Sequence, residues 1–330
     1  MVVDDDDQGA IREDFRPTHF RREPIKHSRQ ACCVGWNKLG SRLATGGVDG
    51  KVAVWRSGEG GSGHVSCETV LSGHKHSVKH LCWDPTNANL VVTADQRDSV
   101  RLWDVRSGAS VAQVTTSGKN LNLAMHPEGS TIAVGDQNDV VSFIDVKTFK
   151  VAAKVSRGKE VNEIAWSASG DLFFLTTGSG TVEVLSYPDL GDPINALESH
   201  TSSALCVAVD PTGSHLATGG ADAIVSLWDV PSMSCVASFS KFETPVRTLG
   251  FSHCGGFLAF ASDDKVVSIV DVRRTRLAHE EETSWAARDL AWSPVRPALA
   301  YVGDARTETD ARGSHGGGGR PSELLTIAYF

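Results

Sequence analysis

The segment ATGGADAIVSLWDV, residues 217–230, contains two short apolar runs separated by glycines and an aspartate. The second run, residues 224–229, has the β-branched residues and the two-residue alternation that are typical of a strand. Glycine and aspartate are frequent in tight turns. The run ends in a Trp-Asp pair, and the same pair recurs at residues 103–104. The segment therefore predicts two antiparallel strands joined by a turn, and the second Trp-Asp pair suggests a repeat.

Seven copies of this pattern occur along the chain. In each copy an apolar run ends at a marker residue, and the markers are Trp36, Trp83, Met125, Trp166, Val209, Phe251 and Trp292. Neighbouring markers are 41 to 47 residues apart, and a four-stranded WD40 blade needs about 40–45 residues. The spacing predicts an all-β fold, a seven-bladed WD40 β-propeller. The Trp-Asp pairs favour it over a kelch propeller, which is another all-β repeat.

Two copies also carry the residues of a buried hydrogen-bond network. In a WD40 blade a histidine, a hydroxyl residue, a turn aspartate and a tryptophan can bond in a chain, as buried polar groups require. The spacing fits His27, Thr45, Asp49 and Trp55 in the first copy and His200, Thr218, Asp222 and Trp228 in the fifth. Three copies, which we expect to cohere by packing alone, are apolar at the tryptophan position: Ile144, Leu185 and Val270.

The second copy departs from this network at one position. His74, Thr93 and Trp103 have the expected spacing, but Arg97 stands where the aspartate belongs. Asp98 follows directly, and we expect it to replace the missing aspartate through a β-bulge.

The seventh copy lacks residues for a fourth strand. Its third strand is expected at 324–330, and the segment 18–25, ahead of the first copy, has no blade of its own. Because an unpaired edge strand promotes aggregation, we expect 18–25 to be the outer strand of the seventh blade and to close the ring. The propeller then comprises residues 15–330, with a disordered acidic tail at 1–14 and flexible glycine-rich loops at 57–66 and 303–321.

Composition and the absence of known motifs exclude several classes of function. The net charge of −8 argues against a general electrostatic attraction to nucleic acid. Seven cysteines without a C-x-x-C motif fit a reducing compartment. No apolar stretch approaches the roughly 18 residues that span a bilayer, and no P-loop, G-x-S-x-G or H-E-x-x-H motif occurs. We therefore expect an intracellular protein that is not an enzyme and has no cofactor, small-molecule substrate or membrane partner.

Three neighbouring histidines, His74, His76 and His80, were considered as metal ligands. No cysteine or carboxylate pattern accompanies them, and His74 already belongs to the network of the second copy. We expect no metal site.

Partner-binding candidates follow from the loops of a propeller. One face carries the residues just before each first strand, which are Arg29, His76, Gly118, Lys159, Ser202, Thr244 and Trp285. Trp285 is either an exposed interface anchor or a side chain packed beneath the preceding loop. Arg29 and Lys159 are candidates on the same face.

Basic residues gather at two further places. Arg16, Arg21, Arg22 and Lys26 lie on or beside the closing segment, and Arg273, Arg274 and Arg276 lie between the last two strands of the sixth copy. Each cluster either contacts phosphate or an acidic partner, or forms a charged surface that protects an edge strand.

Several longer strings resemble one family of WD-repeat proteins. They are TIAVGDQNDVVSFIDVKT (131–148), VNEIAW (161–166), LFFLTTGSGTVEVLSYPDL (172–190), ATGGADAIVSLWDV (217–230) and PVRTLGFSHCGGFLA (245–259). They are similar to the THO complex subunit 3 family over about residues 15 to 302. Arg97 and the two enlarged loops depart from the pattern of that family.

The resemblance implies a function that the repeat itself does not show. It implies a non-catalytic scaffold subunit of the nuclear THO complex, within TREX, which couples transcription to mRNA processing and export. The expected partners are protein subunits, above all a large helical scaffold, with only indirect or weak RNA contact. Two alternatives stay open: an adaptor in another assembly, such as a ubiquitin ligase or chromatin complex, and direct RNA binding through the basic clusters.

Overall fold

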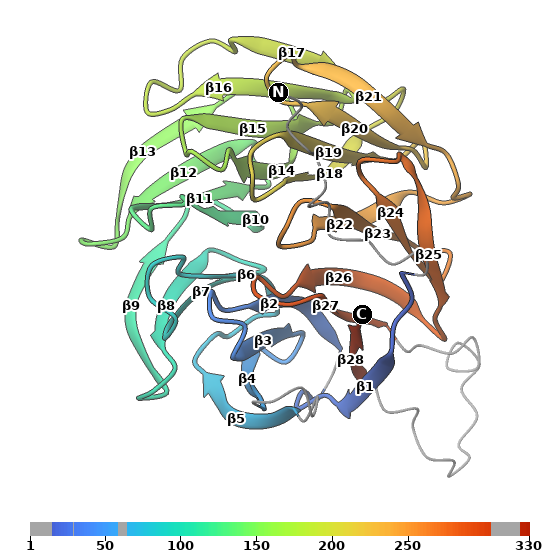
Figure 1. Ribbon diagram of the computed structural model, residues 1–330. Helices are drawn as coiled ribbons and strands as arrows, with labels where there is room; N and C mark the ends of the chain where they lie inside the picture. Colours follow the sequence, from blue (N-terminus) through green and yellow to red (C-terminus); the bar gives the residue numbers. More distant parts are fainter. Residues whose placement is uncertain (1–14, 29, 59–64, 305–323) are drawn as a thin grey trace, which may run out of the picture.

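The computed structural model describes residues 15–28, 30–58, 65–304 and 324–330, and every regular element within these ranges is a β-strand. The strands form seven four-stranded antiparallel sheets, which stand as blades around a central axis (Figure 1). The predicted seven-bladed propeller is therefore confirmed. No helix able to cross a membrane occurs in these ranges. The tail expected at 1–14 lies outside them.

The first four blades follow chain order. Blade 1 contains β2 (Ala31–Trp36), β3 (Arg42–Gly47), β4 (Lys51–Ser57) and β5 (Val65–Ser72). Blade 2 contains β6 (Val78–Trp83), β7 (Leu90–Asp95), β8 (Ser99–Asp104) and β9 (Ala109–Thr115). Blade 3 contains β10 (Asn120–Met125), β11 (Thr131–Asp136), β12 (Val140–Asp145) and β13 (Lys150–Ser156). Blade 4 contains β14 (Val161–Trp166), β15 (Leu172–Thr177), β16 (Thr181–Ser186) and β17 (Asn195–Glu198).

The remaining blades complete the ring. Blade 5 contains β18 (Ala204–Val209), β19 (His215–Gly220), β20 (Val225–Asp229) and β21 (Ser234–Phe239). Blade 6 contains β22 (Val246–Phe251), β23 (Phe257–Ser262), β24 (Val266–Asp271) and β25 (Arg276–Glu282). Blade 7 contains β26 (Ala286–Trp292), β27 (Ala298–Asp304), β28 (Leu324–Tyr329) and, as its outer strand, β1 (His19–Pro24).

Strand pairing extends into both segments that the sequence predicts to be glycine-rich loops. Ser57 belongs to β4, and Val65 and Ser66 belong to β5, so strand pairing extends into the expected loop 57–66 from both sides. Likewise β27 continues to Asp304, into the expected loop 303–321. Residues 59–64 and 305–323 lie outside the described ranges.

Burial explains the sequence pattern of the strands. In β7 and β11 successive side chains are buried, because neighbouring blades cover both faces of these inner strands. The outer strand β9 instead alternates between exposed and half-buried residues. In every blade the pairing of the first two strands shifts register near the start of the first strand. These shifts are β-bulges, which increase the local twist beside the central axis.

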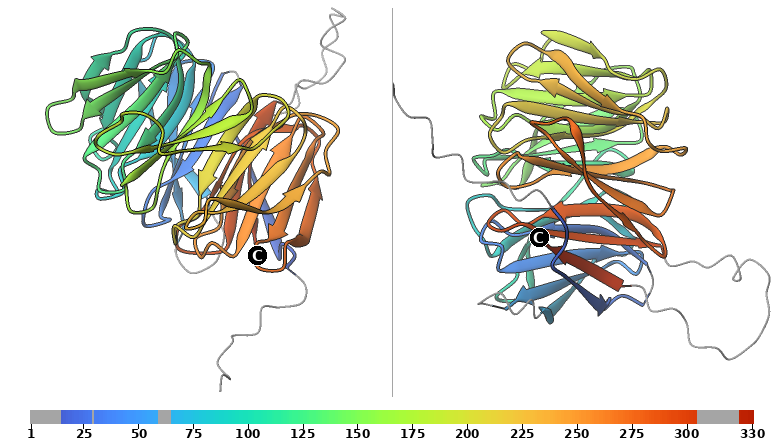
Figure 2. Two further views of the ribbon diagram at one scale, coloured as in Figure 1. Left: turned by 90° about the horizontal axis from the view of Figure 1, so that it is seen from above. Right: turned by 45° about the vertical axis from the view of Figure 1, so that its right-hand side comes forward.

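The N-terminal segment closes the ring as predicted. Strand β1 pairs antiparallel with β28 from His19 opposite Tyr329 to Pro24 opposite Leu324, and the two strands lie side by side in the right-hand view of Figure 2. Pro24 stands at the end of the edge strand, where its missing N–H costs no ladder bond.

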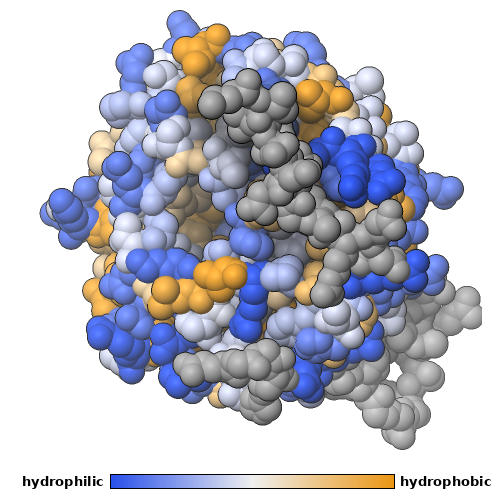
Figure 3. All heavy atoms as spheres, viewed as in Figure 1, coloured by the Kyte–Doolittle hydropathy of each residue, from blue (hydrophilic) through white to orange (hydrophobic). Residues whose placement is uncertain are grey.

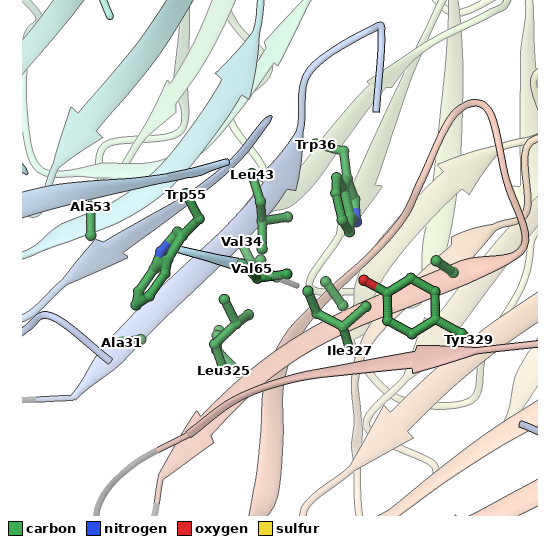
Figure 4. Close-up of a cluster of buried hydrophobic side chains, with 13 residues drawn as sticks. Ala31, Val34, Trp36, Leu43, Ala53, Trp55, Val65, Leu325, Ile327 and Tyr329 are labelled. Carbon is green, nitrogen blue, oxygen red and sulfur yellow. The ribbon is translucent and has the colours of Figure 1, made fainter. Parts of the chain in front are cut away.

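The seam between blades 7 and 1 has its own apolar core. Figure 4 shows Trp36 and Trp55 of blade 1 facing Leu325, Ile327 and Tyr329 of β28. The indole of Trp36 also donates to the Ala291 carbonyl of blade 7, at 3.2 Å. The chain ends are therefore joined by buried contacts as well as by the β1–β28 ladder.

Three of the four tryptophan markers, Trp36, Trp83 and Trp292, donate to a neighbouring blade, whereas the Trp166 indole N–H has no partner among the described residues. The indole N–H of Trp83 donates to the Gly35 carbonyl of blade 1 at 2.9 Å, and that of Trp292 donates to the Gly250 carbonyl of blade 6 at 3.0 Å. A marker such as Met125 or Val209 has no N–H to donate. Large residues at the ends of the first strands thus serve inter-blade cohesion as well as core packing.

Candidate functional site

In blade 1 and in blade 5, the four residues predicted to form a network contact one another within the blade. In blade 1, His27 Nδ1 lies 3.0 Å from Asp49 and His27 Nε2 lies 3.0 Å from Thr45 Oγ1, to which Trp55 donates at 3.1 Å. In blade 5 the corresponding distances for His200, Asp222, Thr218 and Trp228 are 3.0, 3.0 and 3.4 Å. Each network ties the loop before the first strand to the turn between the second and third strands.

These contacts change the ionisation of their members. Burial raises the pKa of Asp49, but hydrogen bonds from the Ser28 N–H and His27 outweigh it, so that the pKa is lowered. For His200, burial lowers the pKa and the nearby Asp222 only partly opposes it. The lowered pKa of Asp49 favours the ionised carboxylate, which accepts hydrogen bonds, and the lowered pKa of His200 favours the neutral imidazole.

Blade 2 has the same network with a different aspartate. His74 Nδ1 lies 3.2 Å from Asp95, His74 Nε2 lies 2.7 Å from Thr93, and Trp103 donates to Thr93 at 2.8 Å. The prediction that Asp98 replaces the turn aspartate was wrong, because Asp95, on strand β7, already supplies the carboxylate. Burial raises the pKa of Asp95, but bonds from His74, Ser99 N–H and Arg97 N–H outweigh it and lower the pKa.

Steric exclusion explains the two arrangements. Gly47 and Gly220 occupy the strand position that Asp95 holds in blade 2, two residues past the network threonine. A Cβ at Gly47 would lie 2.3 Å from His27 Nδ1, and one at Gly220 would lie 2.4 Å from His200 Nδ1. A strand glycine therefore leaves room for a carboxylate from the turn, whereas a strand aspartate supplies the carboxylate itself. In blade 2 the turn position therefore needs no aspartate, and Arg97 occupies it.

Arg97 lies beside a polar cavity at the seam of blades 2 and 3. The cavity has a volume of about 570 Å³ and is lined by residues 76–77, 96–98, 117–119 and 137. These residues belong to the loops before β6 and β10 and to the turns after β7 and β11. We call this the blade 2–3 pocket, and the face that carries such loops and turns the upper face.

Of the polar side chains that line the blade 2–3 pocket, Ser77 and Ser117 are hydrogen-bonded, to the Val48 carbonyl and to Lys154. Among the described residues, the side chains of His76, Gln96, Arg97, Asp98, Lys119 and Gln137 have no hydrogen-bond or ion-pair partner. Arg97, Lys119 and Asp98 supply two fixed positive charges and one carboxylate. The arrangement can bind a polar ligand of complementary charge.

Four cations near the loops of other blades are paired with carboxylates within the chain, whereas Lys51 and Lys265, both exposed, have no ion pair among the described residues. Lys159 lies 2.9 Å and Arg157 lies 3.1 Å from the carboxylate of Glu183. Arg247 and Arg288 both contact Asp263, at 3.0 and 3.2 Å. Lys159, a predicted partner-binding residue, is therefore already engaged in an ion pair.

The central channel is a second polar region. Its cavity, of about 260 Å³, is lined by residues of the first strands, including Cys32, Lys79, Glu163 and Asp289; Figure 3 shows a hollow near the middle of the ring. Burial raises the pKa of Glu163 to about 8 and that of Asp289 to about 7. Asp289 also accepts the Val34 N–H of blade 1 at 2.8 Å. The carboxylate therefore links blade 7 to blade 1.

No metal-binding geometry accompanies these groups. Within the part of the chain that the structure describes, no cluster of three histidine, cysteine or carboxylate side chains is arranged to hold a metal ion.

Trp285 is buried. It is only 7% exposed and packs against Tyr301, with ring centroids 5.7 Å apart. A Cβ at Gly303 would lie 2.3 Å from the Trp285 ring, so this glycine makes room for the indole. Of the two interpretations, the structure supports the packed one, and Trp285 is not an exposed anchor. Arg29 lies outside the described residues.

Apart from Lys26, which lies in the loop before β2, the described residues of the two basic clusters lie away from the loops and turns of the upper face. Arg273, Arg274 and Arg276 surround the exposed turn between β24 and β25, which belongs to the opposite face, and Arg274 lies 3.6 Å from Asp271. Arg21 and Arg22 lie on the edge strand β1, where Arg22 stands over the Phe20 ring at 5.4 Å. The predicted partner residues therefore do not form one site.

Sequence reasoning missed the blade 2–3 pocket. In the sequence Arg97 is only a replacement of the expected turn aspartate, and His76 and Gly118 are predicted to lie on one face. No sequence pattern connects these residues with Lys119, Gln96 or Gln137. The available signal was the Asp-Gln dipeptide that occurs at residues 95–96 and again at 136–137.

The chain is similar to known WD-repeat proteins. The family described as "WD domain, G-beta repeat" matches residues 21–56, 65–104, 191–229 and 233–271. Blade 3 and the first three strands of blade 4 lie outside these matches, and neither blade has the network tryptophan. In three dimensions the chain is similar to the Cps50 (Swd1) β-propeller domain of Myceliophteria thermophila, with a TM-score of 0.78 and 18% identity over 94% of this chain and 100% of that one.

Three curated relatives extend over most of the chain. The THO complex subunit 3 of Arabidopsis thaliana is 43% identical over 291 residues, which are 88% of this chain and 91% of that protein. The WD repeat-containing protein AAC3 of Dictyostelium discoideum is 31% identical, over 84% of this chain and 62% of its own length. Protein TEX1 of Saccharomyces cerevisiae is 22% identical, over 87% and 70%.

Proposed function

The chain belongs to the family of THO complex subunit 3, and on this basis we propose that it is a non-catalytic scaffold subunit of a nuclear THO/TREX-type complex that couples transcription to mRNA processing and export. One observation carries the proposal: the 43% identity extends over 88% of the chain. A match of that extent includes blade 3 and the first three strands of blade 4, which the general WD-repeat pattern does not match.

The geometry supports a binding role rather than catalysis. A nucleophile in an enzyme needs an adjacent base that is itself oriented. The networks do place a threonine hydroxyl, a histidine and an aspartate in a row. Thr45, Thr93 and Thr218 are fully buried, however, and each accepts an indole N–H, so a substrate cannot reach these hydroxyls. In the channel, Asp289 is engaged by the Val34 and Leu290 backbone N–H groups. The partners we propose are therefore protein subunits, with a large helical scaffold first among them, and no cofactor.

Affinity purification tests this proposal. The tagged full chain is recovered from nuclear extract treated with ribonuclease, and the associated proteins are identified by mass spectrometry. We expect THO subunits, including the large helical scaffold, to be recovered at comparable amounts. Recovery of a cullin-containing ligase or a chromatin complex in their place would refute the assignment.

Direct RNA binding is the second candidate, and one observation favours it. Arg273 and Arg276 are exposed at the β24–β25 turn without an acidic partner among the described residues. If this cluster binds RNA, the affinity of the purified chain for single-stranded RNA falls steeply with salt. Changing Arg273, Arg274 and Arg276 to alanine would then remove that salt-dependent binding.

A further inference from the structure

We propose that the blade 2–3 pocket docks an acidic segment of a protein partner, with a partner carboxylate held between Arg97 and Lys119. The inference deepens the proposed scaffold function and rests on it, because it assigns one part of the upper face to partner binding.

The first step is the position of Arg97. In blades 1 and 5 the equivalent turn residue is an aspartate that accepts the backbone N–H and the hydroxyl of the residue after the histidine. Blade 2 needs no such aspartate, because Asp95 bonds His74 from the strand. Arg97 is therefore free of the structural role of its position, and it is exposed on the pocket wall.

The second step is the unmet bonding capacity of the pocket. Gln96 and Gln137 follow the equivalent aspartates of blades 2 and 3 and line the same cavity. A side-chain amide can both donate to and accept from a peptide backbone. Since neither amide has a partner among the described residues, the pocket offers backbone-like hydrogen bonds next to two fixed cations. Its volume of about 570 Å³ is that of a typical binding site.

The third step is charge. The whole chain carries a net charge of −8, yet Arg97 and Lys119 lie in this pocket with Asp98 as the only carboxylate among its described lining residues. Elsewhere Arg157 and Lys159 are paired with Glu183 of blade 4, and Arg247 and Arg288 with Asp263 of blade 6. Cations left without an internal partner gain most from an external anion.

The pocket favours a protein segment over RNA. Proteins that bind single-stranded RNA stack its bases on aromatic side chains, and no aromatic residue other than His76 is among the described lining residues. The Asp98 carboxylate can accept a backbone N–H of a bound peptide. An acidic peptide therefore matches both the charges and the amides.

Site-specific cross-linking within the assembled complex tests the proposal. A photoreactive p-benzoylphenylalanine replaces Ser117, which is exposed on the pocket rim, in the tagged full chain. The complex is purified, irradiated and analysed by mass spectrometry of the cross-linked peptides. We expect the captured segment to be rich in Asp and Glu. A second form, which also carries Arg97→Glu and Lys119→Glu, is expected to cross-link it about tenfold less.

Matched controls separate charge from misfolding. Lys147→Glu/Lys150→Glu makes the same change in net charge at the exposed β12–β13 turn, on the opposite face, and is expected to leave the yield within about twofold. Once the segment is identified, lysine in place of two of its acidic residues is expected to restore cross-linking to the Arg97→Glu/Lys119→Glu form, which a misfolded chain would not allow.

Four outcomes would overturn the pocket proposal: a cross-link to RNA, to residues 1–14 of the same chain, or to a segment without acidic residues, or an unchanged yield in the Arg97→Glu/Lys119→Glu form. Failure of the proposed function is seen separately, because the wild-type chain would then purify without THO subunits.

Discussion

Blades 2 and 5 build the same four-residue hydrogen-bond network with aspartates at different backbone positions. Blade 5 uses Asp222, in the turn, whereas blade 2 uses Asp95, on strand β7. The interaction is conserved between the blades although the residue position is not. The difference teaches that a repeat which moves a structural carboxylate into its strand releases a surface position for another role.

The move also changes the turn. In blade 5, Ala223 has a φ of 64° and its N–H bonds the Gly220 carbonyl at 3.3 Å. In blade 2 the Asp95 carboxylate accepts the N–H groups of Arg97 and Ser99, at 3.0 and 3.1 Å. The Asp95 carboxylate thus stabilises both the network and the turn that presents Arg97.

Removal of either network aspartate should have the largest effect on the free energy of unfolding, and the size of the loss should differ between blades 2 and 5. We expect Asp95→Ala to lower the free energy of unfolding by about 3 kcal/mol, because His74 and Ser99 N–H, both buried, lose their partner. Asp222→Ala also deprives a buried histidine, His200, of its partner, but it should cost less, about 1–2 kcal/mol, because water can replace the bond to the exposed Thr201. Urea unfolding at neutral pH measures both. Equal losses would show that the two arrangements are energetically equivalent.

A graft of the blade 5 arrangement onto blade 2 tests the steric explanation. The triple variant Asp95→Gly/Arg97→Asp/Asp98→Gly restores a strand glycine, a turn aspartate and a residue that accepts positive φ, as Gly50 does in blade 1. We expect it to be about 2 kcal/mol more stable than Asp95→Gly/Asp98→Gly, the matched control without a carboxylate at the turn. If the triple variant and its control unfold at the same urea concentration, the explanation fails.

The sequence predicted the parts of this comparison that depend on local pattern. Seven blades, their closure by the N-terminal strand and the residues of the blade 1 and blade 5 networks follow from period, alternation and fixed spacing. Asp95 could not be predicted in this way, because the spacing from the threonine to the turn aspartate in blades 1 and 5 leads to position 97 in blade 2. Only the strand geometry shows that a Cβ two residues past Thr93 points at the same histidine.

Sites assembled from several loops were beyond sequence analysis for a different reason. The blade 2–3 pocket joins His76, Arg97, Lys119 and Gln137, which come from four segments and meet only when two blades pack side by side. Trp285 was ambiguous because its burial depends on Gly303, at the end of a stretch that composition predicts to be loop. Sequence pattern defines each blade, and contacts between blades define the sites.

The histidine of blade 5 gives that network a pH dependence. Burial lowers the pKa of His200 below its ordinary value of about 6.5. The unfolded chain therefore binds more protons in this range, so the stability that neutral His200 contributes is present above pH 6.5 and is lost as pH falls toward the folded pKa. We expect the urea midpoint to fall with a smaller slope between pH 7 and 5 in His200→Gln than in the wild type. An unchanged slope would mean that His200 does not titrate in this range.

The smallest expected effect is that of Arg97→Ala, which compares the turn positions of blades 2 and 5 directly. If Asp95 carries the structural role in blade 2, Arg97 carries none, and Arg97→Ala should change the free energy of unfolding by no more than about 0.5 kcal/mol, as for an exposed residue without partners. Asp222→Ala, at the equivalent position of blade 5, provides the contrast in the same urea assay. A loss at Arg97 comparable to that at Asp222 would mean that the turn residue of blade 2 is still structural. A stable Arg97→Ala chain that binds its partner less tightly would instead show that position 97 serves recognition in blade 2 and structure in blade 5.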